Sequence, residues 1–154
     1  MQKEYLSRAV ELASENIDQG GGPFGAVIVR KGEVIAEAAN RVTLDNDPTA
    51  HAEVEAIRKA GRAIGNFDLS DCEIYASCEP CPMCLGAIYW ARIPVVYYAS
   101  NRNEAEQAGF DDSLIYDELA KLPEQRTINM ERIREESAEA LFSKWKEKTD
   151  KTAY

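Results

Sequence analysis

The sequence contains a single histidine, His51, and no run of about 18 or more apolar residues, so no membrane-spanning helix is expected. The N-terminal segment MQKEYLSRAVELASENI lacks both a long apolar region and a small-residue cleavage site. It is therefore predicted to form an amphipathic helix rather than a signal peptide. No cysteine lies outside residues 72–84, whereas secreted disulfide scaffolds spread their cysteines to join distant loops. These absences predict a protein of a reducing compartment, and we expect it to be cytoplasmic.

Basic residues are also scarce. The 18 lysines and arginines are outnumbered by 27 aspartates and glutamates, which gives a net charge of -9. Because proteins bind nucleic acids by neutralising phosphates, this charge argues against an extended nucleic-acid surface, although it leaves room for a small basic patch. The chain has 154 residues, of which 45% are hydrophobic, so one domain over residues 1–154 with its own core is the simplest organisation. We expect no nucleic-acid partner and no membrane contact.

Apolar residues recur at helical spacing in some segments and form short β-rich runs in others. The turn at KGE predicts a hairpin between the first two strands, and residues 41–49 are predicted to be a polar loop. Strand–helix–strand units follow the hairpin, so we expect an α/β fold whose mixed, partly parallel sheet carries helices on both faces. Helices are predicted over residues 3–18, 50–64, 81–93, 102–108, 112–120 and about 135–148, and strands over 24–30, 34–40, 72–77 and 94–100.

Three residues in the motifs DPTAHAEV and EPCPMC are candidate metal ligands. Cys81 and Cys84 lie three residues apart in the first turn of a predicted helix, so they share a face at the end where the helix dipole favours thiolates. His51 also begins a predicted helix. Two helix starts that meet would bring one imidazole and two thiolates onto one zinc ion and leave its fourth position for water.

Cys78 provides the alternative, a closed structural site in which four protein ligands surround the zinc. It is predicted to end a strand, outside the helical face that carries the other two thiols. Cys72 opens the same strand and lies further away. Both cysteines are therefore better interpreted as small buried hydrophobic residues.

Glu53 follows His51 by two residues, and such positions do not share a helix face, so it is poorly placed as a further ligand. At the start of a helix its long side chain could still reach a water molecule on the metal, where a general acid/base is needed. The pattern H-x-E followed by P-C-x-x-C is the signature of zinc nucleobase deaminases, and here it reads HAE and PCPMC. Zinc lowers the pKa of water to about 7, so hydroxide could attack an amino-bearing carbon and release ammonia while Glu53 moves protons.

Longer runs extend this pattern over nearly the whole chain, namely GGPFGAVIV, NDPTAHAEV, SCEPCPMCLGAIYWAR, AGFDDS and the terminal tyrosine. The chain resembles the cytidine deaminase-like superfamily and, within it, the bacterial guanine deaminases. The resemblance implies a three-layer α/β/α sandwich with a mixed central sheet, one Zn²⁺ per subunit, and hydrolysis of guanine to xanthine and ammonia. It also implies a homodimer in which C-terminal tails, from about residue 135 to 154, are exchanged so that each closes the partner's site.

The resemblance also implies roles for individual residues. His51, Cys81 and Cys84 would be the zinc ligands and Glu53 the main proton shuttle. Asp112 would contact the amino side of guanine and assist proton transfer. The spacing alone does not distinguish this residue from its neighbour in the AGFDDS run, because either aspartate could instead cap the helix that follows.

The remaining roles concern the base itself. Asn40 would hydrogen-bond the purine and Ala52 would offer backbone contacts. Phe24 and Trp90 would wall the pocket, and Tyr154 of the other chain would cover the base. Each side chain also has a purely structural interpretation: Asn40 could cap the turn that follows it, the two aromatic residues could be core, and Tyr154 could be a frayed end.

Three other functions stay open at this level. Guanosine, cytosine-like rings and triazines are substrates compatible with the same superfamily chemistry. A tRNA adenosine deaminase shares the zinc motifs, but it would need a phosphate-binding surface that the net charge disfavours, and it would not normally carry AGFDDS with a terminal tyrosine. A zinc-stabilised module without activity would require the closed site with Cys78.

Overall fold

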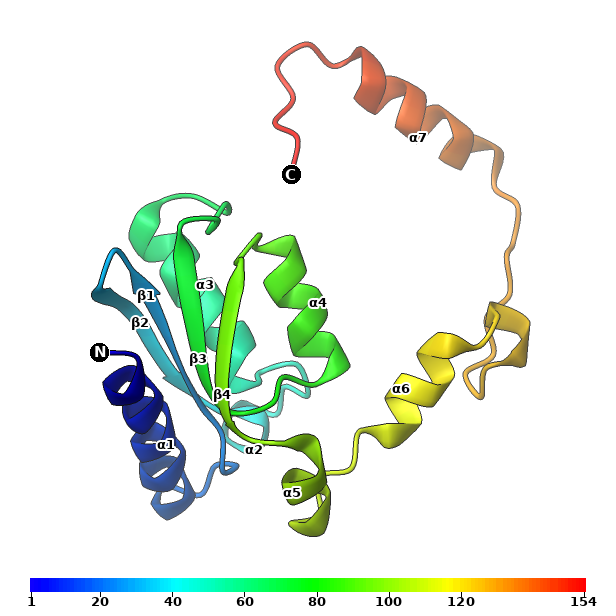
Figure 1. Cartoon of the computed structure of the whole chain (residues 1–154). Coiled ribbons are helices and arrows are strands. Elements are labelled where there is room, and N and C mark those ends of the chain that lie inside the picture. The colour runs from blue at the N-terminus through cyan, green and yellow to red at the C-terminus, as the bar shows by residue number, and fades with distance from the viewer. The chain divides into compact units, whose positions relative to one another are not determined.

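The computed structural model describes all 154 residues, which divide into two compact units, Met1–Ser113 and Leu114–Tyr154. All strands lie in the first unit. Its elements, labelled in Figure 1, are α1 (Gln2–Asp18), β1 (Gly25–Arg30), β2 (Glu33–Ala39), α2 (Val42–Asp45), α3 (Ala52–Ile64), β3 (Cys72–Cys78), α4 (Pro82–Trp90), β4 (Val95–Ser100) and α5 (Arg102–Gln107). The other elements are α6 (Ser113–Ala120), the short 3-10 helix η1 (Pro123–Gln125) and α7 (Glu136–Glu147).

The four strands form one mixed sheet in the order β2-β1-β3-β4. β1 pairs antiparallel with β2 and with β3, whereas β3 pairs parallel with β4. The predicted hairpin is confirmed, since Arg30 pairs with Glu33 across the tight turn. The parallel pair is joined through α4, as a crossover between parallel strands requires.

The residues of β1 alternate between two hydrophobic layers, because successive side chains on a strand point to opposite faces. Val27 and Val29 pack against Ala9 of α1 on one face. Ala26 and Ile28 pack on the other face, in a cluster with buried residues of α3 and α4. Figure 1 shows α1 on one side of the sheet and α3 with α4 on the other, so the predicted three-layer fold is confirmed.

Two predicted boundaries were wrong. Residues 41–49, predicted as a loop, contain α2, which is followed by Asn46 in the left-handed conformation (φ 53°) that asparagine tolerates. The helix predicted over 81–93 ends at Trp90. Arg92 has a φ of 60°, and Ile93 precedes a proline, which disfavours helical backbone at that position.

In the second unit, Glu118 organises the chain after α6. Its carboxylate accepts a hydrogen bond from the Thr127 N–H at 2.6 Å and pairs with Lys121 at 2.5 Å, while its carbonyl accepts one from Arg126 at 3.1 Å. None of the helices in the structure combines the length and apolar character that crossing a bilayer requires. Large apolar side chains of this unit are exposed, namely Leu114, Ile115, Leu119, Leu122, Ile128, Met130, Ile133, Leu141, Phe142 and Trp145.

Candidate metal centre and active site

His51 and Cys81 occupy equivalent places at the starts of two helices. His51 is the N-cap of α3 with extended backbone (φ -71°, ψ 154°), and Cys81 is the N-cap of α4 (φ -65°, ψ 169°). Pro82 follows in the first turn of α4, where its missing N–H has no intrahelical acceptor to lose. Neither side chain makes a capping hydrogen bond, so the imidazole and the thiol are not used up in capping.

The three predicted ligands come together. The Nδ1 atom of His51 lies 3.6 Å from the Sγ atom of Cys81 and 3.5 Å from that of Cys84. All three donor atoms lie within 4.8 Å of one another. Zinc bonds of about 2.0–2.1 Å to nitrogen and 2.3 Å to sulfur at tetrahedral angles place nitrogen and sulfur about 3.6 Å apart, so this donor set fits a zinc ion.

The two thiols of this group have opposite protonation tendencies. A hydrogen bond from the Cys84 thiol lowers the pKa of Cys81 to about 4, with a further contribution from His51. The same hydrogen bond and burial raise the pKa of Cys84. The Cys81 thiolate in turn raises the pKa of His51. A divalent cation takes the place of shared protons in such a cluster, which is why metal binding to thiols and imidazole releases protons.

Cys78 does not join the donor group. It ends β3, and its Sγ atom lies 3.8 Å from the carbonyl oxygen of Asn101. Burial raises the pKa of its thiol to about 11. Cys72 is buried at the other end of the strand beside Asp71. Both cysteines are therefore core residues, and the group offers three protein donors rather than four.

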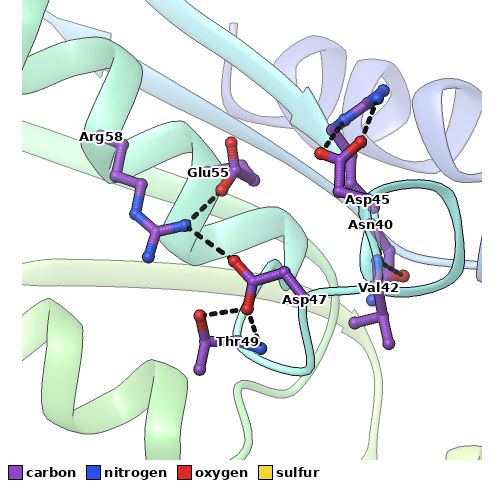
Figure 2. Close-up of polar contacts among 8 residues, drawn as sticks. Asn40, Val42, Asp45, Asp47, Thr49, Glu55 and Arg58 are labelled. Atoms are coloured by element: carbon purple, nitrogen blue, oxygen red, sulfur yellow. Dashed lines mark hydrogen bonds and ion pairs between the residues drawn. The ribbon is translucent and has the colours of Figure 1, made fainter.

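The loop before His51 is held by its own side chains, as Figure 2 shows. Oδ1 of Asp47 accepts hydrogen bonds from the Thr49 N–H at 2.8 Å and from the Thr49 hydroxyl at 2.7 Å. Arg58 of α3 lies 3.9 Å from the other oxygen of Asp47 and 2.5 Å from Glu55. The Thr49 carbonyl then accepts from the His51 N–H at 2.8 Å. Asp47 thus holds the backbone that positions the His51 imidazole.

Glu53 lies in the first turn of α3 with only 7% of its surface exposed. Burial raises the pKa of its carboxyl group, and the neighbouring Cys81 thiolate acts in the same direction. Its carboxylate is not one of the atoms that form the ligand group. A buried carboxyl group beside a metal site, with a pKa above its ordinary value, has the properties of a general acid/base.

Asn40 follows the last residue of β2 and is also buried, at 6% exposure. Its side-chain Oδ1 accepts a hydrogen bond from the Val42 N–H at 3.1 Å, so the predicted capping of the turn is observed (Figure 2). Capping uses the carbonyl end of the carboxamide only. The amide nitrogen remains a donor, so a ligand contact and the cap are compatible.

The two aspartates of AGFDDS are distinguished by the structure. Asp111 accepts a hydrogen bond from the Ser113 N–H at 2.8 Å, which lowers its pKa, so it supports the start of α6. Asp112 is partly buried, and burial together with the Cys81 thiolate raises its pKa. Asp112 is therefore the aspartate within electrostatic reach of the ligand group.

An aromatic contact joins Phe24 to the same segment. The ring of Phe24, partly buried against the core, meets the ring of Phe110 edge to face with centroids 4.9 Å apart. Sequence reasoning missed Phe110, although it stands inside AGFDDS directly before the two aspartates. The contact connects the residue directly before β1 with the segment that carries Asp112.

The other predicted pocket residues differ in position. Ala52 is fully buried in the first turn of α3. The N–H groups of a first turn have no acceptor within the helix, so the backbone here can donate to a ligand. Trp90 is the last residue of α4, about 12 Å along the helix from Pro82, and is 69% exposed. Its interpretation as core is therefore wrong. Tyr154 belongs to the second unit.

Comparisons with known proteins agree with this site. Residues 1–100 match the cytidine and deoxycytidylate deaminase zinc-binding region. Guanine deaminase of Bacillus subtilis is 54% identical over 151 residues, which are 97% of this chain and 97% of that protein. An X-ray structure of guanine deaminase from Bacillus subtilis has a TM-score of 0.96 and 53% identity, and the match covers 99% of this chain and 98% of that one. A tRNA-specific adenosine deaminase of Aquifex aeolicus is 43% identical over 101 residues, 65% of this chain and 67% of its own. The structure of guanine deaminase from Nitrosomonas europaea has a TM-score of 0.68 and 32% identity, and the match covers 79% of this chain and 66% of that one.

The matched zinc-binding region contains all three donors that the structure brings together, His51, Cys81 and Cys84. Zinc is therefore the metal of this site. The chain belongs to the family of zinc-binding cytidine and deoxycytidylate deaminases.

Proposed function

We propose that this protein hydrolyses guanine to xanthine and ammonia. The observation that carries the proposal is the extent of the likeness to the guanine deaminase of Bacillus subtilis, which covers 97% of both chains at 54% identity. The adenosine deaminase match covers only 101 residues. The likeness to the guanine deaminase therefore extends over parts of the chain, including its C-terminal part, that lie outside the shared zinc motifs.

In this proposal His51, Cys81 and Cys84 hold the zinc ion, which when bound supplies the Lewis acidity that makes water nucleophilic near neutral pH. Water adds to the guanine carbon that carries the exocyclic amino group, and the bond from that carbon to the amino nitrogen breaks. Glu53 accepts a proton from the attacking water and passes it to the ring nitrogen. It then moves the proton of the added hydroxyl group to the departing amine, which leaves as ammonia while the carbonyl forms. Its raised pKa supports this role, because the carboxyl group must exist in both protonation states during the cycle.

Four further residues would recognise the base. Asn40 would donate from its amide nitrogen, because its Oδ1 is already bonded to the Val42 N–H. Ala52 would offer backbone contacts at the start of α3, and Phe24 would form one wall. Asp112 would accept from the amino group and assist its departure, a role that its partial burial and its position near Cys81 support.

The proposal includes a homodimer with exchanged tails. The second unit exposes large apolar side chains on α6, on α7 and between them, including Leu141 at 64% and Phe142 at 74%. A second copy of the chain is the occupant that such a surface would bury. In the exchanged form, residues from about 135 to 154 close the partner's site, with Tyr154 over the base and Trp90 lining the pocket. The cytoplasm, where these four free cysteines stay reduced, is the proposed location.

Substrate choice is tested by incubating the purified zinc-loaded protein with guanine, guanosine, cytosine, adenine and a triazine amine while ammonia release is measured. We expect preferred turnover of guanine. Preferred turnover of guanosine or a pyrimidine would retain the chemistry and change the roles of Asn40 and Asp112. Deamination of tRNA at low salt would favour the adenosine deaminase instead. A fully zinc-loaded protein without turnover of any of these compounds would favour the non-catalytic module.

Tail exchange is tested by complementation between two inactive variants. One chain carries Glu53→Gln, and the other lacks residues 150–154. In an exchanged heterodimer, the truncated chain keeps its Glu53 and receives an intact tail from its partner, so co-expression should restore activity. Each homodimer alone serves as the control. Absence of restored activity in an isolated heterodimer would mean that each tail acts on its own chain.

A further inference from the structure

Only four polar or charged residues are buried in the structure, and three of them lie next to the proposed site or the strand ends beside it. Glu53 and Asn40 belong to the site, and Ser77 accepts a hydrogen bond from the Gly25 N–H at 3.0 Å. The fourth, Asn16, is 4% exposed in the last turn of α1 and has no role in the chemistry described above. A buried carboxamide is costly unless it is bonded, so its partners indicate what it does.

Asn16 binds two separate backbone segments through one nitrogen atom. Its Nδ2 donates to the carbonyl oxygen of Gly22 at 2.8 Å and to that of Asn40 at 2.7 Å. Its own backbone carbonyl accepts from the Gly21 N–H at 2.9 Å. The side chain therefore joins the end of α1, the glycine-rich turn and the end of β2.

The glycine-rich turn is shaped around this side chain. A Cβ atom on Gly21 would lie 2.3 Å from Nδ2 of Asn16, and one on Gly22 would lie 3.1 Å from Oδ1 of Asn40. The first distance is far below any ordinary contact. Glycine at position 21 is thus required by the close approach of Asn16, which gives a physical reason for part of the GGG run.

The bonds of Asn16 determine where the Asn40 carboxamide points. The Asn40 N–H donates to the Phe24 carbonyl at 3.0 Å, its carbonyl accepts from Asn16, and its Oδ1 accepts from the Val42 N–H (Figure 2). Both backbone groups and the side-chain oxygen are then fixed. What remains for a ligand is the Nδ2 donor of Asn40, held on a backbone that cannot easily rotate.

We propose that Asn16 is a positioning residue that orients Asn40 for substrate recognition. The inference rests on the proposed function for its kinetic part. Asn16→Ala removes the donor from the buried carbonyl of Asn40 and from the partly buried carbonyl of Gly22, so the end of β2 and the Val42 turn should loosen. Because the lost order affects binding of the base rather than proton transfer, we expect KM for guanine to rise about tenfold, the equivalent of one net hydrogen bond, with kcat changed less than threefold.

A second readout is independent of activity. Hydrogen exchange of the Val42 amide, which is bonded to Oδ1 of Asn40, should become about tenfold faster in Asn16→Ala, whereas exchange of the Ile28 amide in β1 should stay as in the unsubstituted protein. Zinc content should stay at one per chain, because Asn16 contacts none of the ligands. Tyr5→Phe is the matched control. It removes another side-chain-to-backbone bond of α1, from Tyr5 to the Gly32 carbonyl at 2.6 Å, and should change neither KM nor the Val42 exchange rate.

Gly21→Ala is a second variant that retains the buried amide. Its new methyl group would overlap with Nδ2 of Asn16 and push that side chain away from the carbonyls that it bonds. We therefore expect the same faster exchange of the Val42 amide and the same rise in KM. The proposal is overturned if Val42 exchange and KM stay within twofold of the unsubstituted protein in whichever of the two variants folds. If the unsubstituted protein does not deaminate guanine, the proposed function fails, while the exchange measurement still decides the role of Asn16.

Discussion

Replacing Gly25 by alanine is the most direct test of how closely α1 approaches the sheet. A Cβ atom on Gly25, the first residue of β1, would lie 2.2 Å from the carbonyl oxygen of Ala9 and 2.8 Å from the backbone nitrogen of Ala13. A third atom, Cβ of Leu12, would lie at 2.9 Å. All three belong to α1 and two are backbone atoms, so no rotamer change can relieve the overlap. The helix itself must move outward by about 1 Å to restore an ordinary contact.

The cost follows from this displacement. Overpacking a close-packed interior costs about 1–3 kcal/mol, and a clash with backbone atoms belongs at the upper end of that range. The lower backbone entropy of alanine in the unfolded chain returns about 0.5–1 kcal/mol at most. We therefore expect a net loss of about 2 kcal/mol, equivalent to a Tm lower by roughly 6 °C for a chain of this size.

Thermal unfolding followed by circular dichroism measures this change. Gly86→Ala is the control, because Gly86 lies in α4 with no atom within 4 Å of a new Cβ. Alanine there should leave Tm unchanged or raise it, since glycine is the weaker helix former. A Gly25→Ala protein that unfolds within 2 °C of the unsubstituted chain would refute the reasoning, because α1 would then not be seated on β1 as described.

Three further predictions concern the site. Glu53→Gln should retain zinc and lower kcat for ammonia release by about 10²–10⁴-fold, and substantial residual turnover would remove Glu53 from the mechanism. Metal analysis should show that Cys78→Ala keeps one zinc per chain while Cys84→Ala loses it; loss of zinc from the first variant would support a closed four-ligand site. Asp47→Ala should speed zinc release to a chelator by about tenfold, because the loop before His51 loses the hydrogen bonds between Thr49 and Asp47. Asp47→Asn keeps an acceptor oxygen and should release zinc at the rate of the unsubstituted chain.

The elements and the metal ligands were predictable because their signals are local. Alternation in β1 and the helical spacing of the segment after His51 report which face is buried, and each ligand stands at a recognisable helix start. The single-domain organisation over residues 1–154, with an exchanged tail, stays a prediction, since the chain divides at Ser113 into two units.

The features that sequence reasoning missed depend on contacts between distant segments. Asp111 and Asp112 differ by only one position in their spacing from every other motif, so the sequence does not separate their roles. In the structure, the hydrogen bond from the Ser113 N–H assigns capping to Asp111, and Asp112 is the residue that the Cys81 thiolate affects. Asn16 belongs to no motif, since its importance arises from two carbonyls that the fold brings to it. The alternative interpretation of Trp90 as core rested on the apolar face of its helix, yet α4 ends at this residue with the ring exposed.

The two helix starts that hold zinc have a consequence for the protein before it acquires metal. A typical N-cap side chain stabilises its helix by about 1 kcal/mol, but His51 and Cys81 give no such bond. The metal-free chain therefore has two adjacent helices with unprotected first turns, which a single ion secures together. Serine or aspartate at either position would make the newly synthesised, metal-free chain more robust while destroying the enzyme. Metal binding would therefore stabilise both helix starts at the same time as it completes the site.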